Sequence, residues 1–415
     1  MKKDVFMTTD ILLPGRGVAP EVWSVVACDQ FSSEREYWER VRRRVGESPS
    51  TLNMIIPEAY LEGIDEREEI ARIGAVMDDY LGRGLLREVE DSFVYVERTV
   101  SGGQVRKGLV GAVDLEEYEF SSGDAAILAS EGTVLDRLPP RIRIRKAASM
   151  ELPHIMTFIA DKDASVIEPL AKKAGSLPVL YDFELMEGGG RLKGWRVCGS
   201  DALEAMAAMR SLHGRSKTLM IMGDGNHSLA AAKSYWDELK QGLSGAEMET
   251  HPARRALLEV NNLYDHAVTF EPIHRVIFGV DKAAFTDEFI NALHFDGNTG
   301  MEYALQVTSL DAPNAQLRTA DVCARAGCIG DMTDAVQTFL DGYVSRSGGR
   351  IDYIHDADAV ERLVMSEGCV GIILPGMAKS EFFDTVAARG VFPRKSFSVG
   401  HARDKRYYME CRGIR

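Results

Sequence analysis

Residues 218–239, TLMIMGDGNHSLAAAKSYWDEL, decide the fold. The apolar run over residues 218–222 is bounded by glycine, which is typical of a buried strand. Apolar residues then recur at spacings of three and four, which predicts an amphipathic helix carrying Leu229, Ala232, Trp236 and Leu239 on one face. A strand is therefore expected to pass through a tight polar turn directly into a helix.

The turn between this strand and helix is a candidate anion site. The first N–H groups of a helix have no partner within it, the helix dipole adds partial positive charge there, and glycine lets a ligand approach the main chain. A phosphate or carboxylate fits such a turn. The lysine of a Walker loop is missing, and Ser228 stands where a dinucleotide fingerprint has its third glycine. The candidate residues are Gly223, Asp224, Gly225, Asn226, His227 and Ser228.

A purely structural interpretation of the same turn stays open. Asn226 or Ser228 would cap the helix, and Asp224 would form an Asx turn. The gathering of Asp, Asn, His and Ser at the mouth of one buried strand favours the functional interpretation.

Composition narrows the class of protein. The chain has 415 residues, 45% hydrophobic and 27% charged, which predicts a soluble globular protein of one large body or two intimate domains. A net charge of −14 argues against nucleic acid or an anionic membrane as partner. No apolar run is long enough to span a membrane, and the six scattered cysteines favour free thiols, so a cytoplasmic location is expected. Residues 1–280 are expected to form the core and residues 281–415 to complete the same body.

Three further segments carry candidate site residues. Asp29 follows a short apolar strand expected over residues 23–27. Residues 141–145 alternate between arginine and isoleucine, so a strand there would place Arg141 and Arg143 on one face with Arg145. His274 and Arg275 form a polar pair inside an apolar run, which is unusual for a core strand. A strand is also expected over residues 51–57, and a hairpin over residues 93–113.

Together these segments resemble a known family. The chain is identified as a member of the bacterial and archaeal family catalogued as domain of unknown function 1015, which is related to the ParB/sulfiredoxin-like group that includes free-serine kinases. The resemblance implies a mixed α/β sheet with a ParB/sulfiredoxin-like core. It rests on residues 23–29, 131–133, 141–145, 223–228, 272–275 and 393–396.

The central turn departs from the family pattern at two positions. The family's usual turn is Asp-Gly-His-His-Arg, and this chain has Asn226 and Ser228 in place of the first histidine and the arginine. In related proteins that arginine is expected to touch phosphate. Arg275, Lys395 or an arginine of residues 141–145 is expected to substitute for it.

The first hypothesis is a Mg-dependent kinase that phosphorylates a small metabolite resembling serine, with ATP or ADP as nucleotide. Phosphoryl transfer needs positioning and charge neutralisation more than covalent chemistry. The turn amides, Arg275 and Lys395 would hold phosphates, and Asp224 would hold Mg²⁺ or orient the nucleophile. His227 is the acid/base candidate, and Asp29 is an alternative base.

The second hypothesis is a nucleotide- or metabolite-binding sensor that uses the same site without turnover, and the changes at Asn226 and Ser228 favour it slightly. A third is a metal hydrolase built on Asp224, His227 and His274. The partner expected in each case is a small molecule, and a homodimer is left open.

Overall fold

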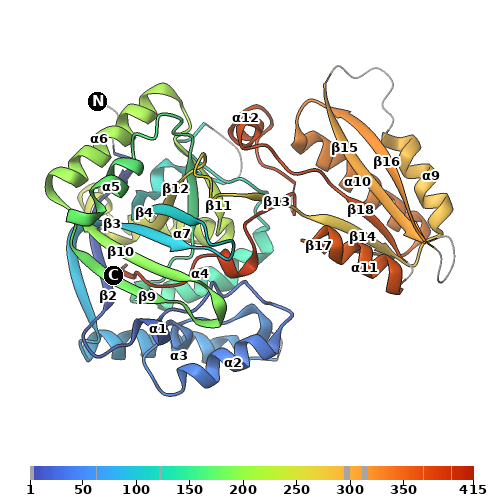
Figure 1. The fold of residues 1–415 in the computed structure, drawn as a ribbon. Helices are drawn as coiled ribbons and strands as arrows, with labels where there is room; N and C mark the ends of the chain where they lie inside the picture. The colour runs from blue at the N-terminus through green and yellow to red at the C-terminus, as the bar shows by residue number, and fades with distance from the viewer. Residues whose placement is uncertain are drawn as a thin grey trace. The chain divides into compact units, whose positions relative to one another are not determined.

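The computed structural model describes residues 4–61, 63–120, 124–293, 300–310, 316–367, 369–393 and 395–415. The chain divides into two compact units (Figure 1). Unit 1 comprises Met1–Val268 and His401–Arg415, and unit 2 comprises Thr269–Gly400. The division differs from the predicted one after residue 280, because unit 2 begins earlier and the last segment of the chain returns to unit 1.

Unit 1 is built on an 11-stranded sheet in the order β5-β6-β11-β8-β12-β4-β3-β10-β9, with β1 beside β4 and β2 beside β3. β11 pairs parallel with β6 and antiparallel with β8, so the sheet is mixed and the predicted α/β class is confirmed. A separate pair joins β7 and β20. The strands are β1 Phe6–Met7, β2 Thr9–Pro14, β3 Leu86–Thr99, β4 Val105–Asp114, β5 Tyr118–Glu119, β6 Ile127–Leu128, β7 Met150–Glu151, β8 Met156–Ile159, β9 Val179–Glu184, β10 Arg191–Val197, β11 Met220–Asp224, β12 Arg255–Asn262 and β20 Arg412–Gly413.

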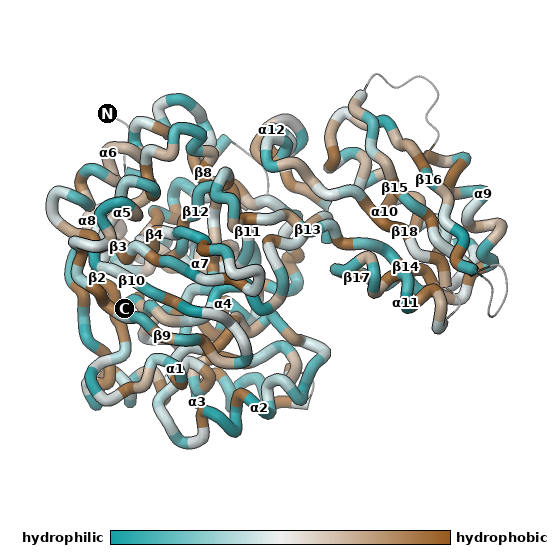
Figure 2. Tube along the Cα trace, viewed as in Figure 1, coloured by the Kyte–Doolittle hydropathy of each residue, from teal (hydrophilic) through white to brown (hydrophobic). Residues whose placement is uncertain are grey.

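Both faces of this sheet are covered, because successive side chains of a strand point to opposite sides. In β12, Leu257 packs into the core beneath the N-terminal helices, and its neighbour Leu258 packs into the core beneath α7. Figure 2 shows apolar residues recurring along these elements. The helices of unit 1 are α1 Pro20–Trp23, α2 Arg35–Val45, α3 Glu66–Gly82, α4 Leu138–Ala147, α5 Glu168–Lys173, α6 Gly199–Arg215, α7 Asn226–Leu239 and α8 Gly245–Thr250.

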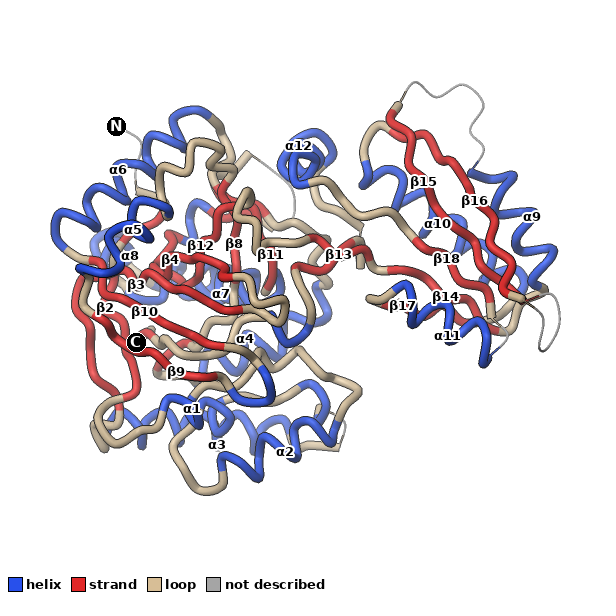
Figure 3. Tube along the Cα trace, viewed as in Figure 1, coloured by secondary structure: helices blue, strands red, loops and turns tan. Residues whose placement is uncertain are grey.

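Unit 2 is a second α/β body with an antiparallel five-stranded sheet in the order β16-β15-β18-β14-β17 (Figure 3). A two-stranded pair, β13 with β19, joins the first and last residues of the unit. The strands are β13 Phe270–Pro272, β14 His274–Phe278, β15 Met301–Leu310, β16 Leu317–Ala326, β17 Arg350–Ile354, β18 Val370–Ile373 and β19 Phe397–Val399. The helices are α9 Lys282–Leu293, α10 Ile329–Ser347, α11 Ala357–Glu367 and α12 Lys379–Arg389.

Several predicted elements are confirmed and others are wrong. The hairpin of β3 and β4 and the β11–turn–α7 unit form as expected. Residues 141–145 lie in helix α4 rather than a strand, because Pro139 and Pro140 occupy its first turn and start the helix. Residues 51–54 form a 3₁₀ turn capped by Ser50, and Trp23 ends helix α1 instead of opening a strand. None of the described helices combines the length and apolar character needed to cross a membrane.

Candidate functional site

The turn between β11 and α7 requires both of its glycines. Gly225 is the N-cap of α7 with φ 80°, a left-handed conformation that favours glycine. A Cβ atom on Gly223 would lie 2.4 Å from the ring of Phe158, and one on Gly225 would lie 3.0 Å from Cα of Ile155. No side chain caps the helix and its first turn holds no acidic residue. The positive end of the helix dipole is therefore not neutralised by a cap.

Asn226 and Ser228 do not cap the helix, so the capping alternative is wrong for both. Asn226 Oδ1 accepts a hydrogen bond from the backbone N–H of Ser130 (3.1 Å), and Asn226 Nδ2 donates to the hydroxyl of Ser130 (3.2 Å). Ser228 Oγ lies 3.3 Å from His154 Nε2. Asp224 Oδ1 accepts from the backbone N–H of the next residue, Gly225, at 2.9 Å.

A lysine from the end of the chain lies at this turn. Lys405 Nζ is 3.4 Å from Asp224 Oδ2, and the two side chains are 8% and 16% exposed. Asp224 Oδ2 is buried and makes no hydrogen bond. Sequence analysis missed Lys405 because nothing in its local sequence separates it from the other charged residues of the C-terminal segment.

His154 connects the turn to the N-terminal loop. Its Nε2 lies 3.3 Å from Ser228 Oγ and 3.8 Å from Asp29 Oδ2, and its Nδ1 lies 3.0 Å from the hydroxyl of Tyr408. The Tyr408 oxygen accepts a hydrogen bond from the backbone N–H of Cys28 at 3.2 Å, and its own proton can be donated to Nδ1. A neutral His154 that accepts from Tyr408 carries its proton on Nε2, and a charged His154 carries one there as well, so an Nε2–H group faces Asp29 and Ser228 in both forms.

Asp29 is held as a carboxylate. Burial alone would raise its pKa, but the charge of His154, a hydrogen bond from Gln30 and the charge of Lys405 together hold the pKa below its ordinary value. Burial and the Asp29 charge raise the pKa of the adjacent Cys28 thiol to about 12. Asp29 is thus able to accept a hydrogen bond from a hydroxyl, whereas Cys28 stays a thiol and is not a nucleophile.

His227 is engaged by the segment that follows β6. Its Nε2 accepts a hydrogen bond from the backbone N–H of Val134 at 3.2 Å. With the contacts of Asn226 to Ser130, this bond holds residues 130–134 beside the start of α7. The geometry fits a positioning role for His227 better than that of an acid/base.

Arg143 lies on the opposite side of α4 from Arg141, which corrects the expectation that the three arginines share one face. Alternate residues lie about 200° apart around a helix, so each arginine reaches a different acidic partner. Arg141 pairs with Glu58 at 2.7 Å, and Arg143 pairs with Glu66 at 2.6 Å on the surface. Of these pairs only Arg141–Glu58 adjoins the Asp29 loop, because the backbone N–H of Glu58 donates to the carbonyl of Cys28 (2.8 Å).

His274, Arg275 and Lys395 belong to unit 2. Both residues of the polar pair are buried in β14. His274 Nδ1 accepts from the backbone N–H of Leu374 (3.1 Å), and burial lowers its pKa, with Arg275 adding to the effect. Arg275 Nε donates to Gln337, and Lys395 is exposed in a turn.

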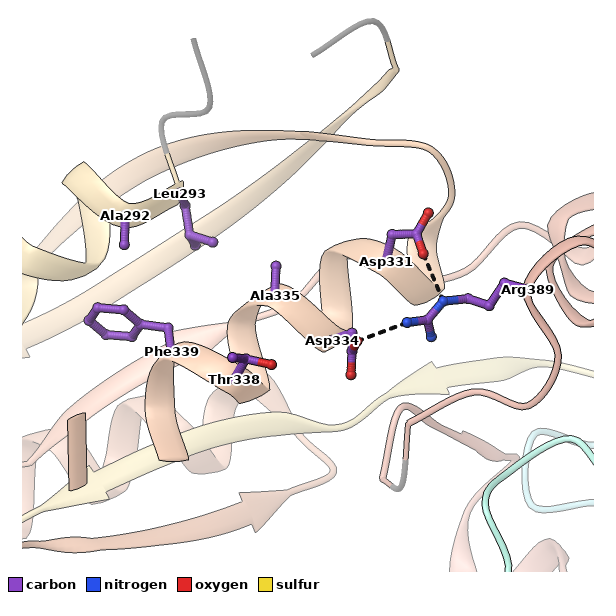
Figure 4. A pocket seen from close by; sticks show the side chains of 8 residues that line it. All are labelled: Ala292, Leu293, Asp331, Asp334, Ala335, Thr338, Phe339 and Arg389. Carbon is purple, nitrogen blue, oxygen red and sulfur yellow. Dashed lines mark hydrogen bonds and ion pairs between the residues drawn. The ribbon is translucent and has the colours of Figure 1, made fainter. Parts of the chain in front are cut away.

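Unit 2 has its own pocket, of about 420 Å³, lined by α9, α10 and α12 (Figure 4). Arg389 donates to Asp331 (2.7 Å) and Asp334 (2.9 Å) at one end. Two carboxylates around one guanidinium leave this end negative, which disfavours a phosphate. The other lining residues are Ala292, Leu293, Ala335, Thr338 and Phe339.

Metal-ligating side chains do not gather into a cage in the described parts of either unit. No group of three or more His, Cys, Asp or Glu residues there could hold a metal ion. Asp224, His227 and His274 therefore do not form the metal centre that the hydrolase hypothesis needs.

Comparison with known proteins places the chain in a family. One family profile, described as a protein of unknown function (DUF1015), matches residues 12–328. The chain belongs to this family. The match covers more than half of the sequence and confirms the resemblance drawn from the motifs. No curated protein matches the sequence.

Solved structures show a more distant likeness to this DUF1015 protein. Free serine kinase in complex with AMP has a TM-score of 0.37 and 10% identity, covering 72% of this chain and 90% of that chain. A conserved hypothetical protein from Pyrococcus furiosus has a TM-score of 0.33 and 11% identity, covering 72% and 90%. SbnI with a C-terminal truncation, from Staphylococcus aureus, has a TM-score of 0.34 and 11% identity, covering 70% and 82%. No function is transferred from scores this low.

Proposed function

We propose that unit 1 binds a phosphate-bearing small molecule, such as ATP or ADP, where α7 begins. The observation that carries the proposal is Lys405, whose side chain is only 8% exposed at an uncapped helix start. Removing an ammonium group from water is costly unless it is paired and hydrogen-bonded. Among the described residues, Asp224 is the acidic side chain that pairs with it, at 3.4 Å. A phosphate would supply acceptors for the remaining Lys405 protons and for the helix amides.

The second part of the proposal is phosphoryl transfer to a small hydroxyl-bearing metabolite resembling serine. The substrate hydroxyl would attack the terminal phosphorus of ATP, the bond to the bridging oxygen would break, and ADP would leave. Asp29, held ionised, would accept the proton of the substrate hydroxyl. The Nε2–H group of His154 would orient that hydroxyl. Asp29 thus takes the role of base that the sequence suggested first for His227.

Asp224 is the residue that would hold Mg²⁺. Magnesium is commonly bound by one or two carboxylates together with substrate phosphates, rather than by a cage of protein ligands. Asp224 Oδ2 makes no hydrogen bond and only the ion pair with Lys405, so this oxygen would be shared between Lys405 and the ion. When bound, the ion would neutralise charge on the phosphate oxygens.

Calorimetry with ADP and ATP, followed by detection of phosphorylated product with Mg²⁺ and serine-like metabolites, tests both parts. The expected result is saturable nucleotide binding and a nucleotide-dependent product. Asp224→Asn is expected to keep nucleotide binding and lose turnover. Absence of both binding and product would overturn the proposal.

A sensor that binds nucleotide without turnover is the second candidate. Asn226 and Ser228 replace two residues of the family's usual turn, and both are used in contacts to Ser130 and His154. This candidate expects a nucleotide-induced rise in melting temperature that is the same for the wild type and Asp224→Asn, with no product from any metabolite.

A further inference from the structure

One edge of the unit 2 sheet is a long strand. β16 pairs with β15 along ten residues, and no strand in the described parts of the chain pairs with its other side. Its side chains alternate, so that Asp321, Cys323 and Arg325 share an exposed face while Val322 and Ala324 are buried. An edge strand presents backbone N–H and C=O groups that can pair with another strand.

The exposed face of β16 is self-complementary in charge. Asp321 and Arg325 lie two residues before and two residues after Cys323. We propose that β16 pairs antiparallel with β16 of a second copy of this chain, about a two-fold axis at Cys323. Asp321 then lies opposite Arg325 of the second copy, and the symmetry repeats that pair. This assigns a face to the homodimer that the sequence left open, and it does not depend on nucleotide binding.

Other registers of the same strand pair are disfavoured. A slip of one residue would place exposed side chains opposite buried ones. A two-fold axis at Asp321 would oppose two carboxylates, and an axis at Arg325 would oppose two guanidinium groups. Like charges directly opposite each other destabilise a strand pair, so the charges select the axis at Cys323.

Contacts within the chain hold these side chains on the exposed face. Gln306 Nε2 donates to Asp321 Oδ1 at 3.0 Å, and Arg325 pairs with Glu302, both from the neighbouring strand β15. The charges are therefore positioned along the strand before a second copy arrives. Because one strand pair is a small interface, the dimer is expected to be weak and concentration-dependent.

Cross-linking tests the axis directly. Residues opposite each other on antiparallel strands have Cα atoms about 4.5–5.5 Å apart, and a disulfide needs about 4.4–6.8 Å. Mild oxidation of the full chain is expected to give a dimer linked through Cys323. Cys323→Ser is expected to abolish the cross-link, and the matched Cys198→Ser variant to keep it. Cross-linking that survives Cys323→Ser, or none in the wild type, would overturn the proposal.

A charge swap separates this interface from any other. Asp321→Arg and Arg325→Asp each place like charges opposite one another, so each alone is expected to dimerise about tenfold more weakly in sedimentation equilibrium. An equal mixture of the two variants restores opposite charges at both positions and is expected to dimerise again, as is the double variant. Melting curves check folding. Single variants that associate like the wild type, or a mixture that stays monomeric, would contradict the proposed register.

Discussion

The hydroxyl of Tyr408 lies 3.0 Å from Nδ1 of His154, at the centre of the candidate site. This hydroxyl also accepts from the backbone of Cys28, and when it donates to Nδ1 of a neutral imidazole, the proton of the ring lies on the other nitrogen, Nε2. A tyrosine from the end of the chain thus sets which proton His154 offers to Asp29. The proposed chemistry therefore depends on contacts between three segments that are distant in sequence.

Replacing Tyr408 tests that assignment. Tyr408→Phe is expected to let the neutral imidazole of His154 exchange between its two tautomers. The kcat for phosphoryl transfer should fall about 10- to 100-fold, a typical effect of removing a partner that orients a functional histidine. The KM for nucleotide is expected to stay unchanged. Nitrogen NMR shifts of His154 report the tautomer independently of activity. Tyr407→Phe is the matched control, because its hydroxyl donates to the Met186 carbonyl instead. An unaltered His154 spectrum in Tyr408→Phe would rule the assignment out.

Lys405 is expected to be the main cation at the phosphate. Lys405→Met keeps the aliphatic stem and removes the charge, so ADP should bind about 10- to 100-fold more weakly by calorimetry, as the loss of a charge-assisted hydrogen bond predicts. The difference from the wild type should shrink at high salt. Lys217→Met is the control, because the Lys217 side chain is 80% exposed and pairs with Asp124 on the surface. Equal ADP affinities for Lys405→Met and the wild type would place the phosphate elsewhere.

The ionised state of Asp29 predicts a pH dependence of stability. Its folded-state pKa is lowered, so it contributes stability that is present above the unfolded pKa of about 4 and is lost as the pH falls through the folded value. Asp29→Asn lacks this contribution. The difference in unfolding free energy between wild type and variant should therefore be largest near neutral pH and decline in acid. Chemical denaturation from pH 7 to pH 3 measures it, and a difference that grows in acid would contradict the lowered pKa.

Arg406 anchors the segment that carries Lys405. Its side chain is 5% exposed and pairs with Glu259 at 2.9 Å and Glu410 at 2.5 Å. Arg406→Met would leave buried Glu410 without its ion-pair partner and Glu259 with only the charge of Arg106 nearby, so unfolding in urea should lose about 3–5 kcal/mol. Arg215→Met removes an exposed pair with Asp163 and should cost about 1 kcal/mol or less. A loss no larger than that of the control would show that Arg406 does not anchor the segment.

The sequence alone determined the local elements of this protein and its family. The β11–turn–α7 unit and the β3–β4 hairpin follow from the spacing of apolar residues and from glycines at tight turns, which act over a few neighbouring positions. The motifs also identified the family. Asp29 and Asp224 were found in this way because each closes or follows a short apolar run.

Tertiary structure decided which charged side chains meet. Lys405, His154 and Tyr408 carry no distinguishing local pattern. Lys405 and Tyr408 reach Asp224 and His154 because the last segment of the chain folds back into unit 1, and His154 is brought beside the turn because β8 pairs with β11. The alternation of residues 141–145 predicted a strand, but two prolines at the first turn started a helix and separated the arginines. Periodicity reports which face of one element is buried, whereas pairing of charges depends on long-range packing that a local pattern does not encode.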